Sequence, residues 1–279
     1  MGNYLRPGSL SEATEALSAR RFSILAGGTD FFPARVGNAV DEDILDVTSI
    51  PELRGISEEE AGWRIGAAVT WSEVAQASLP RYFACLQLAA REIGGVQIQN
   101  AGTLAGNLCN ASPAADGVPA LLALDARVEL ASKGGRRELP LSRFITGSRQ
   151  TARSADEIVT AVRVPRRGPH ARSAFLKLGA RKYLVISIAM AAALVDCDAD
   201  GRIEGCAFVV GACTPVAVRL PALEARLTGT TLAAGLAEGV SVEDLAPLAP
   251  IDDVRGSAAY RLDAASTLLR RLIVALAHE

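Results

Sequence analysis

The 279-residue sequence predicts an α/β or α+β protein with two domains, and three observations lead to this class. Strand-like apolar runs alternate with amphipathic helical stretches along the chain. The composition, 49% hydrophobic and 22% charged, suits a globular protein with a large core. A polar segment rich in glycine and proline, 166–169, marks a candidate domain boundary, and the pattern of elements changes after it.

The first fifty residues or so predict a compact α/β unit. Ser9 and Glu12 form a capping-box pattern in front of a helical repeat of apolar residues. The apolar run 22–26 is a predicted strand, and the residues Ala26-Gly27-Gly28-Thr29-Asp30, here called the first glycine segment, follow it. Pro33 fits the first turn of a helix or an irregular turn, and 43–47 is a second predicted strand.

The middle of the chain alternates between the two element types. Strands are predicted at 63–67, 127–131 and 157–164, with a hairpin turn at 133–136. Thr70 and Glu73 form a second capping box. Helices are predicted at 80–93 and at 119–124. Gly94 and Gly95 are expected to end the helix at 80–93. The residues Asn100 to Leu108, here called the second glycine segment, are expected to form a long loop.

Beyond the boundary we expect a smaller domain with a small antiparallel sheet. Strands are predicted at 175–178, 186–195 and 206–210, and short helices at 221–227 and 231–238. A long helix is predicted at 257–278, with one apolar face formed by Tyr260, Ala264, Leu268, Leu272 and Ala275.

Composition excludes several function classes. A net charge of −2 and an aromatic content of 5% argue against a nucleic-acid surface. None of the five cysteines forms a C-x-x-C pair, so we expect no metal site. No apolar h-region follows the first residues, so we do not expect a signal peptide, and the longest uncharged apolar run, 183–195, is too short for a spanning helix of ~20 residues. We therefore expect a cytoplasmic protein without membrane insertion. His170 and His278 are expected at the surface, and no side chain has the pattern of an acid–base catalyst.

The two glycine segments are the strongest candidates for a binding site. Glycine allows a ligand to approach the backbone closely, and successive N–H groups can form a cradle for an anion. Neither segment matches a P-loop or the Rossmann fingerprint, and neither contains Lys or Arg. A hydrogen bond to a charged group contributes about 1.5–3 kcal/mol. Four or five such bonds can exceed the ~8 kcal/mol of micromolar binding. The segments therefore predict a diphosphate site within a dinucleotide site, and ordinary turns are the alternative.

The same residues resemble a known family. Ala26-Gly27-Gly28-Thr29-Asp30 resembles the A-G-G-T-[DS] loop of the FAD-binding (medium) subunit of molybdenum hydroxylases, which include xanthine dehydrogenase and carbon monoxide dehydrogenase. The segment Asn100–Leu108 is similar to N-x-G-T-[IL]-G-G-N-[IL], and Ser112-Pro113 with Asp116 is similar to S-P-x-x-D. Gln99 and Ala105 depart from the pattern, where Arg and Gly are usual.

The resemblance implies an α+β fold with a two-part FAD-binding domain of the PCMH type. This domain would cover 1–167, in subdomains of about 1–55 and 56–167. A smaller α/β flavoprotein C-terminal domain would follow at 168–279.

The resemblance also implies a set of FAD-binding residues. Backbone amides of both segments would hold the pyrophosphate, and the residues carried over are Ala26, Gly27, Gly28, Thr29, Asp30, Asn100, Thr103, Leu104, Ala105, Gly106 and Asn107. Asp116 would contact the adenosine part, with a helix N-cap as the alternative. Val159 would pack near the flavin or simply belong to the core.

Two further residues would lie at the isoalloxazine ring. Lys177 would stand at its edge, where a cation raises the flavin potential, and a solvated strand lysine is the alternative. Tyr183 would lie over the ring, with a core or interface position as the alternative.

By resemblance, the chain is an FAD-binding electron-transfer subunit of a heterotrimeric oxidoreductase, with no catalytic side chain of its own. A large molybdopterin subunit would oxidise the substrate, and a small subunit with two [2Fe-2S] clusters would deliver electrons. The FAD would pass them to an external acceptor, and the heterotrimer could dimerise. The alternatives are a stand-alone FAD-dependent oxidoreductase, for which Cys109 is the one cysteine within a predicted loop, and an interaction module without flavin.

Overall fold

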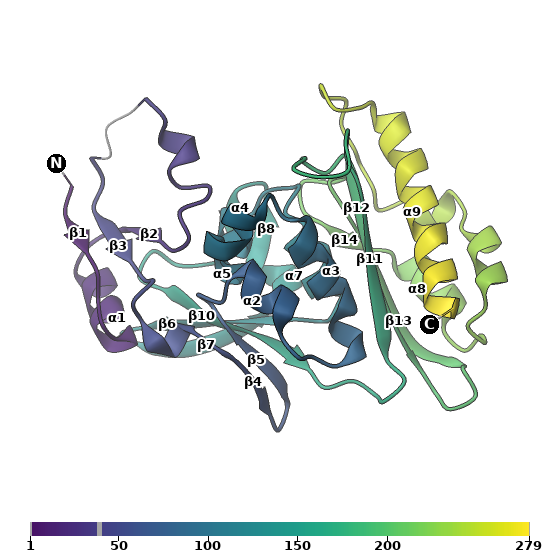
Figure 1. The fold of residues 1–279 in the computed structure, drawn as a ribbon, viewed down its shortest axis with the longest axis horizontal. Coiled ribbons are helices and arrows are strands. Elements are labelled where there is room, and N and C mark those ends of the chain that lie inside the picture. Colours follow the sequence, from purple (N-terminus) through teal and green to yellow (C-terminus); the bar gives the residue numbers. More distant parts are fainter. Residues whose placement is uncertain (1, 38–40, 279) are drawn as a thin grey trace.

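Three main sheets lie side by side along the long axis of the computed structural model, which describes residues 2–37 and 41–278 (Figure 1). The N-terminal sheet is at one end, a five-stranded sheet lies under a group of short helices in the middle, and the C-terminal sheet stands at the other end. This mixed architecture confirms the predicted α+β class.

The N-terminal unit is a small parallel sheet with one helix. Its strands, in the order β1-β3-β2, are β1 (Tyr4–Leu5), β3 (Ile44–Asp46) and β2 (Ser23–Leu25). Helix α1 (Leu10–Ala19) begins at Ser9, whose side chain accepts from the Glu12 amide as predicted. In a capping box the Glu12 carboxylate would accept from the amide of Ser9. Here it accepts from the amide of Gly8 instead. Pro33 opens the 3₁₀ turn η1 (Pro33–Arg35).

The middle region is an antiparallel sheet in the order β4-β5-β10-β6-β7. Its strands are β4 (Ile56–Glu59), β5 (Gly62–Gly66), β10 (Ile158–Pro165), β6 (Arg127–Ser132) and β7 (Gly135–Pro140). The helices of this region are α2 (Trp71–Gln76), α3 (Ala84–Glu92), α4 (Val96–Ala101), α5 (Leu104–Asn110), α6 (Gly117–Ala123) and α7 (Leu141–Phe144). Strands β8 (Ile145–Gly147) and β9 (Gln150–Thr151) form a separate short hairpin. The second capping box is confirmed, since Thr70 and Glu73 bond reciprocally at the start of α2.

The second glycine segment is helical, so the predicted long loop is wrong. Its first residues end α4, Gly102 is an extended joint, and Thr103 caps α5 by accepting from the Gly106 amide at 3.0 Å. Loop composition misled the prediction, because the small residues here belong to two short helices joined at the extended Gly102.

The C-terminal sheet is a central layer with helices on both faces. Its order is β11-β12-β13-β14, with strands β11 (Arg172–Leu178), β12 (Ala189–Cys197), β13 (Ile203–Gly211) and β14 (Val218–Arg219). Helices α3 and α6 contact one face, and α8 (Pro221–Leu227) and α9 (Ala258–His278) contact the other. Strand β12 reads as a continuous apolar run because both of its faces are buried.

Three predicted elements differ in detail. The helix expected at 80–93 is divided into a 3₁₀ turn, η3 (Arg81–Phe83), and α3. The helix expected at 231–238 is the 3₁₀ stretch η4 (Ala234–Gly239). On α9, Tyr260 and Ala275 are exposed, and the buried stripe instead includes Arg261, whose guanidinium donates to the carbonyls of Ile188, just before β12, and Ala212, just after β13. No helix in the described ranges combines the length and apolar character that crossing a membrane requires.

Candidate functional site

A cleft of about 550 Å³ lies between the N-terminal unit and the middle region. Its size is typical of sites for small organic ligands and cofactors. The walls include the first glycine segment, the start of α5 and the beginning of β10. Ten of the residues carried over from the family resemblance line it, namely Ala26, Gly27, Gly28, Thr29, Asp30, Thr103, Ala105, Gly106, Asn107 and Val159.

The first glycine segment is a true loop whose glycines are required by geometry. A Cβ on Gly27 would lie 1.9 Å from the carbonyl oxygen of Ala101, so this residue lets the two glycine segments touch. Gly28 has a φ of +72°, which L side chains rarely adopt. Within the described residues, no hydrogen bond uses the backbone amides of Gly27, Gly28, Thr29 or Asp30. These amides are therefore available to an anion in the cleft.

In the second glycine segment the amides of residues 104–107 already donate to protein oxygens, whereas no hydrogen bond within the described residues uses the Thr103 amide. The amides of Leu104 and Ala105 donate to the carbonyls of Val69 and Ala67, at 2.9 and 3.3 Å. Those of Gly106 and Asn107 donate to the side chain and the carbonyl of Thr103. The expected cradle of free amides is therefore wrong for these residues. The helical position of Ala105 also removes the difficulty of its missing glycine, because its φ is not positive.

Asn107 carries the clearest sign of an absent partner. Its Oδ1 atom is buried and has no hydrogen-bond partner. A buried polar atom without a partner costs about 1–3 kcal/mol, so native structures usually satisfy it with protein, water or ligand. Asn107 lines the cleft, and a ligand there could supply the missing donor.

Two arginines that the motif search missed add positive charge to the cleft. Arg149 and Arg153 line it from the hairpin β8–β9 and the residues that follow. Arg149 has a φ of +60° and donates to Asn110, and Arg153 donates to the Glu157 carbonyl at 2.7 Å. They lie more than forty residues after the second glycine segment, so only the fold brings them to the site. The unusual backbone of Arg149 left no signal in the sequence.

A second cavity, here called the interdomain chamber, has a volume of about 320 Å³. It adjoins the cleft, because Ile93, Ile98 and Asn107 line both. The other wall residues are Gly94, Gly95, Ala114, Asp116, Leu184, Val185 and Ile186. The chamber thus lies between the middle region and the loop that joins β11 to β12.

Asp116 and Lys177 meet in a buried ion pair at the chamber wall. Lys177 Nζ is 2.6 Å from Asp116 Oδ2, and their side chains are only 5% and 7% exposed. Lys177 also donates to the Glu92 carbonyl, and Ser187 Oγ donates to Asp116 Oδ1. Burial raises the pKa of the Asp116 carboxyl, while the ammonium of Lys177 and the hydroxyl of Ser187 act in the opposite direction.

The ion pair argues against a helix N-cap role for Asp116 and against a solvated position for Lys177. Asp116 occupies the N-cap position of α6, but its side chain makes no capping hydrogen bond. Lys177 is not solvated. Because the two side chains touch, they cannot contact the opposite ends of an extended dinucleotide.

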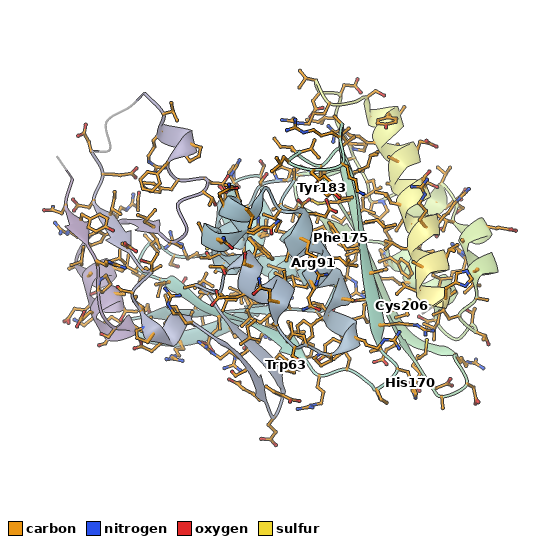
Figure 2. All side chains as sticks on the ribbon, in the orientation of Figure 1. Trp63, Arg91, His170, Phe175, Tyr183 and Cys206 are labelled. Atoms are coloured by element: carbon orange, nitrogen blue, oxygen red, sulfur yellow. The ribbon has the colours of Figure 1, made fainter. Side chains whose placement is uncertain are left out.

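Besides Lys177, three carried-over residues line neither cavity. Asn100 is exposed on α4, where its side chain accepts from Ser72. Leu104 is fully buried in the core. Tyr183 is 62% exposed in the loop between β11 and β12, near the upper end of the C-terminal sheet in Figure 2. Cys109 belongs to α5, not to a loop, and lines the cleft. His170 and His278 are exposed, as expected.

Comparison with known proteins gives matches along nearly the whole chain. Residues 1–167 match the family described as the FAD binding domain in molybdopterin dehydrogenase. Residues 174–276 match the CO dehydrogenase flavoprotein C-terminal domain.

Curated relatives and solved structures give the same picture. The xanthine dehydrogenase FAD-binding subunit of Escherichia coli O157:H7 is 31% identical over 97% of this chain and 94% of its own length. The nicotine 6-hydroxylase medium subunit of Paenarthrobacter nicotinovorans is also 31% identical, over 97% of this chain and 95% of its own. A carbon monoxide dehydrogenase structure from Hydrogenophaga pseudoflava superimposes with a TM-score of 0.87 and 28% identity, covering 99% of this chain and 97% of the matched chain.

Proposed function

The chain belongs to the family of FAD-binding subunits of molybdenum hydroxylases, and from this premise we propose that it binds FAD in the cleft and relays electrons through it. When bound, FAD accepts electrons from one carrier and gives them to another. The residues of this chain bind the cofactor, orient it and set its electrostatic surroundings. The observation that carries the proposal is the set of free amides at residues 27–30.

The residues of the cleft fit a dinucleotide diphosphate. The amides of the first glycine segment have no protein partner and can donate to an anion, whose charge the guanidinium groups of Arg149 and Arg153 would complement. The amide side chain of Asn107 and the hydroxyl of Thr103 are polar groups on the opposite wall. The proposed site thus combines backbone amides of the first glycine segment with side chains of the second, in place of the expected amide cradle in each segment.

We place the flavin ring in the interdomain chamber and the adenosine part in the cleft near Val159. Asp116 and Lys177 are in contact at the chamber, whereas Val159 lines only the cleft. A flavin that exchanges electrons with other carriers must be reachable from outside. The chamber meets this need, because its wall residues Leu184 and Ile186 are more than half exposed. The roles assigned to Asp116 and Val159 by resemblance are thereby exchanged.

The proposal extends to the partners and the location. Relatives carry names such as medium chain and medium subunit, so they belong to multi-subunit enzymes. We propose that a large molybdopterin subunit oxidises the substrate and that a small subunit with [2Fe-2S] clusters supplies electrons. An external acceptor, which the chain does not identify, would receive them. Dimerisation of the heterotrimer and a cytoplasmic location remain predictions.

The division into domains is also part of the proposal. We keep an FAD-binding domain at 1–167, with subdomains of about 1–55 and 56–167, and a C-terminal domain at 168–279. The separate parallel and antiparallel sheets of the first part support the inner division.

The test is cofactor retention by the purified chain. We expect a yellow protein with a flavin absorption spectrum, or one that acquires it when FAD is added. Gly28→Val should lose this spectrum, because it disturbs the loop with the free amides. Gly235→Ala is the matched control, since nothing lies within 4 Å of the position of its Cβ. A colourless wild-type protein that takes up no FAD would contradict the proposal.

A further inference from the structure

One carboxylate of the middle region holds both ends of a loop from the C-terminal sheet. The loop 179–186 runs between β11 and β12. Lys177, just before it, and Ser187, just after it, bond to the two oxygens of Asp116, at 2.6 and 2.5 Å. The backbone closes the same loop, because the Ile188 amide donates to the Leu178 carbonyl at 2.8 Å. Asp116 therefore fixes the position of the Lys177 ammonium as well as the loop.

The charges of this cluster lie where solvent can hardly screen them. The side chains of Asp116 and Lys177 are nearly fully buried, and Asp116 lines the interdomain chamber. The electrostatic effect of a charge on a neighbour grows as the local dielectric falls. Glu92, whose carbonyl accepts from Lys177, is a further acidic residue whose charge acts on Asp116. The ammonium and the carboxylate of the pair nearly cancel each other's field in the chamber.

We propose that Asp116 is a positioning residue that compensates the charge of Lys177 and so keeps the reduction potential of the bound flavin low. This inference rests on the proposed function, which places the ring in the chamber. Reduction of the neutral oxidised ring by two electrons and one proton leaves it with one negative charge. An uncompensated ammonium beside it would favour the reduced form. With Asp116 ionised, the ring gives up its electrons more readily to an acceptor.

The experiment measures the midpoint potential of FAD in the purified, FAD-loaded full chain, by reduction with dithionite against a redox dye. Asp116→Asn keeps the size of the side chain and a partner for Ser187 but removes the charge. We expect its ratio of reduced to oxidised FAD, at a fixed applied potential, to rise about tenfold, which is about 30 mV for a two-electron couple. Lys177→Met should change the ratio in the opposite direction.

Two further variants separate charge from structure. The double variant Asp116→Asn/Lys177→Met carries no net charge change and should return close to the wild-type potential. Ser187→Ala removes a hydrogen bond without a charge and should shift the potential much less than Asp116→Asn. If Asp116→Asn alone loses FAD, the double variant is compared with Lys177→Met, and its potential should be the higher of the two.

Several outcomes would overturn the inference while leaving the proposed function intact. One is a wild-type potential in Asp116→Asn with FAD fully bound. Another is a shift in the same direction for both single variants. Loss of FAD from every folded variant would assign the cluster to cofactor retention alone and would also overturn it. Failure of the wild-type chain to bind FAD would instead contradict the proposed function itself.

Discussion

The two glycine segments have similar compositions but serve the cleft in different ways. The first is an irregular loop with a left-handed glycine and amides that have no partner among the described residues. The second is a helix junction in which the amides of 104–107 already donate to protein oxygens. The first segment can therefore present backbone donors to an anion. The second forms part of the cleft wall, caps α5 through Thr103, and contributes the polar side chains of Thr103 and Asn107.

This difference shows that a glycine in a motif can be required for unlike reasons. Gly27 allows contact between two backbones, and Gly28 allows a left-handed turn. A Cβ on Gly106 would lie 2.7 Å from the capping Oγ1 of Thr103. Substitutions that look equivalent in the sequence should thus differ widely in their effect.

The largest effect is expected for Gly27→Ala. Its Cβ would lie 1.9 Å from the Ala101 carbonyl oxygen and 2.9 Å from the Cα of Gly102, and backbone atoms cannot move aside as a side chain can. Overpacking of this kind costs about 3 kcal/mol or more, so the two segments should separate. We expect a thermal midpoint lower by roughly 6–12 °C, at about 2–4 °C per kcal/mol for a chain of this size. We also expect complete loss of FAD.

Gly235→Ala serves as the control for this measurement, because its Cβ meets no atom within 4 Å. Retention of FAD together with an unchanged midpoint in Gly27→Ala would show that the contact between the segments is not needed.

An intermediate effect is expected at Gly28, and two substitutions can separate its cause. Its φ of +72° costs a β-branched residue about 1–2 kcal/mol or more, whereas asparagine tolerates this region better. Gly28→Val should therefore lose FAD, and Gly28→Asn should keep it with a reduced affinity. Both can be followed by titration of the apoprotein with FAD. Equal losses in the two variants would instead point to the clash with the ring of Phe32, 2.8 Å from the position of the Cβ.

Local sequence patterns predicted the fold well and the site only in part. Both capping residues, Ser9 and Thr70, and most strands follow from short-range chemistry, so the sequence suffices for them. The burial of Lys177 depends on Asp116, sixty-one residues away in the chain, and no periodicity reports such a contact. The same holds for Arg149, whose place in the cleft comes from the β8–β9 hairpin. The helical second segment was missed because glycine and alanine occur both in loops and at tight helix junctions.

A smaller effect is expected for Thr103, which tests the second segment as a cap. Thr103→Val keeps the shape of the side chain but removes the oxygen that accepts from Gly106, at a cost of about 1 kcal/mol. Thr103→Ser retains that oxygen and should retain stability. Thermal unfolding of both variants without FAD measures this contribution. A Thr103→Val midpoint equal to that of Thr103→Ser would show that the cap contributes nothing.

The smallest effect is expected for Ala105→Gly, which restores the residue usual in the family pattern. Ala105 is 5% exposed in the first turn of α5, and its amide donates to the Ala67 carbonyl. A glycine would therefore release no additional donor to the cleft. It would lower helix stability by up to about 1 kcal/mol, because glycine is a poorer helix former than alanine. We expect FAD affinity within twofold of the wild type and a thermal midpoint lower by a few degrees at most. A tenfold gain in FAD affinity would mean that this amide turns toward the ligand, and the two segments would then be alike after all.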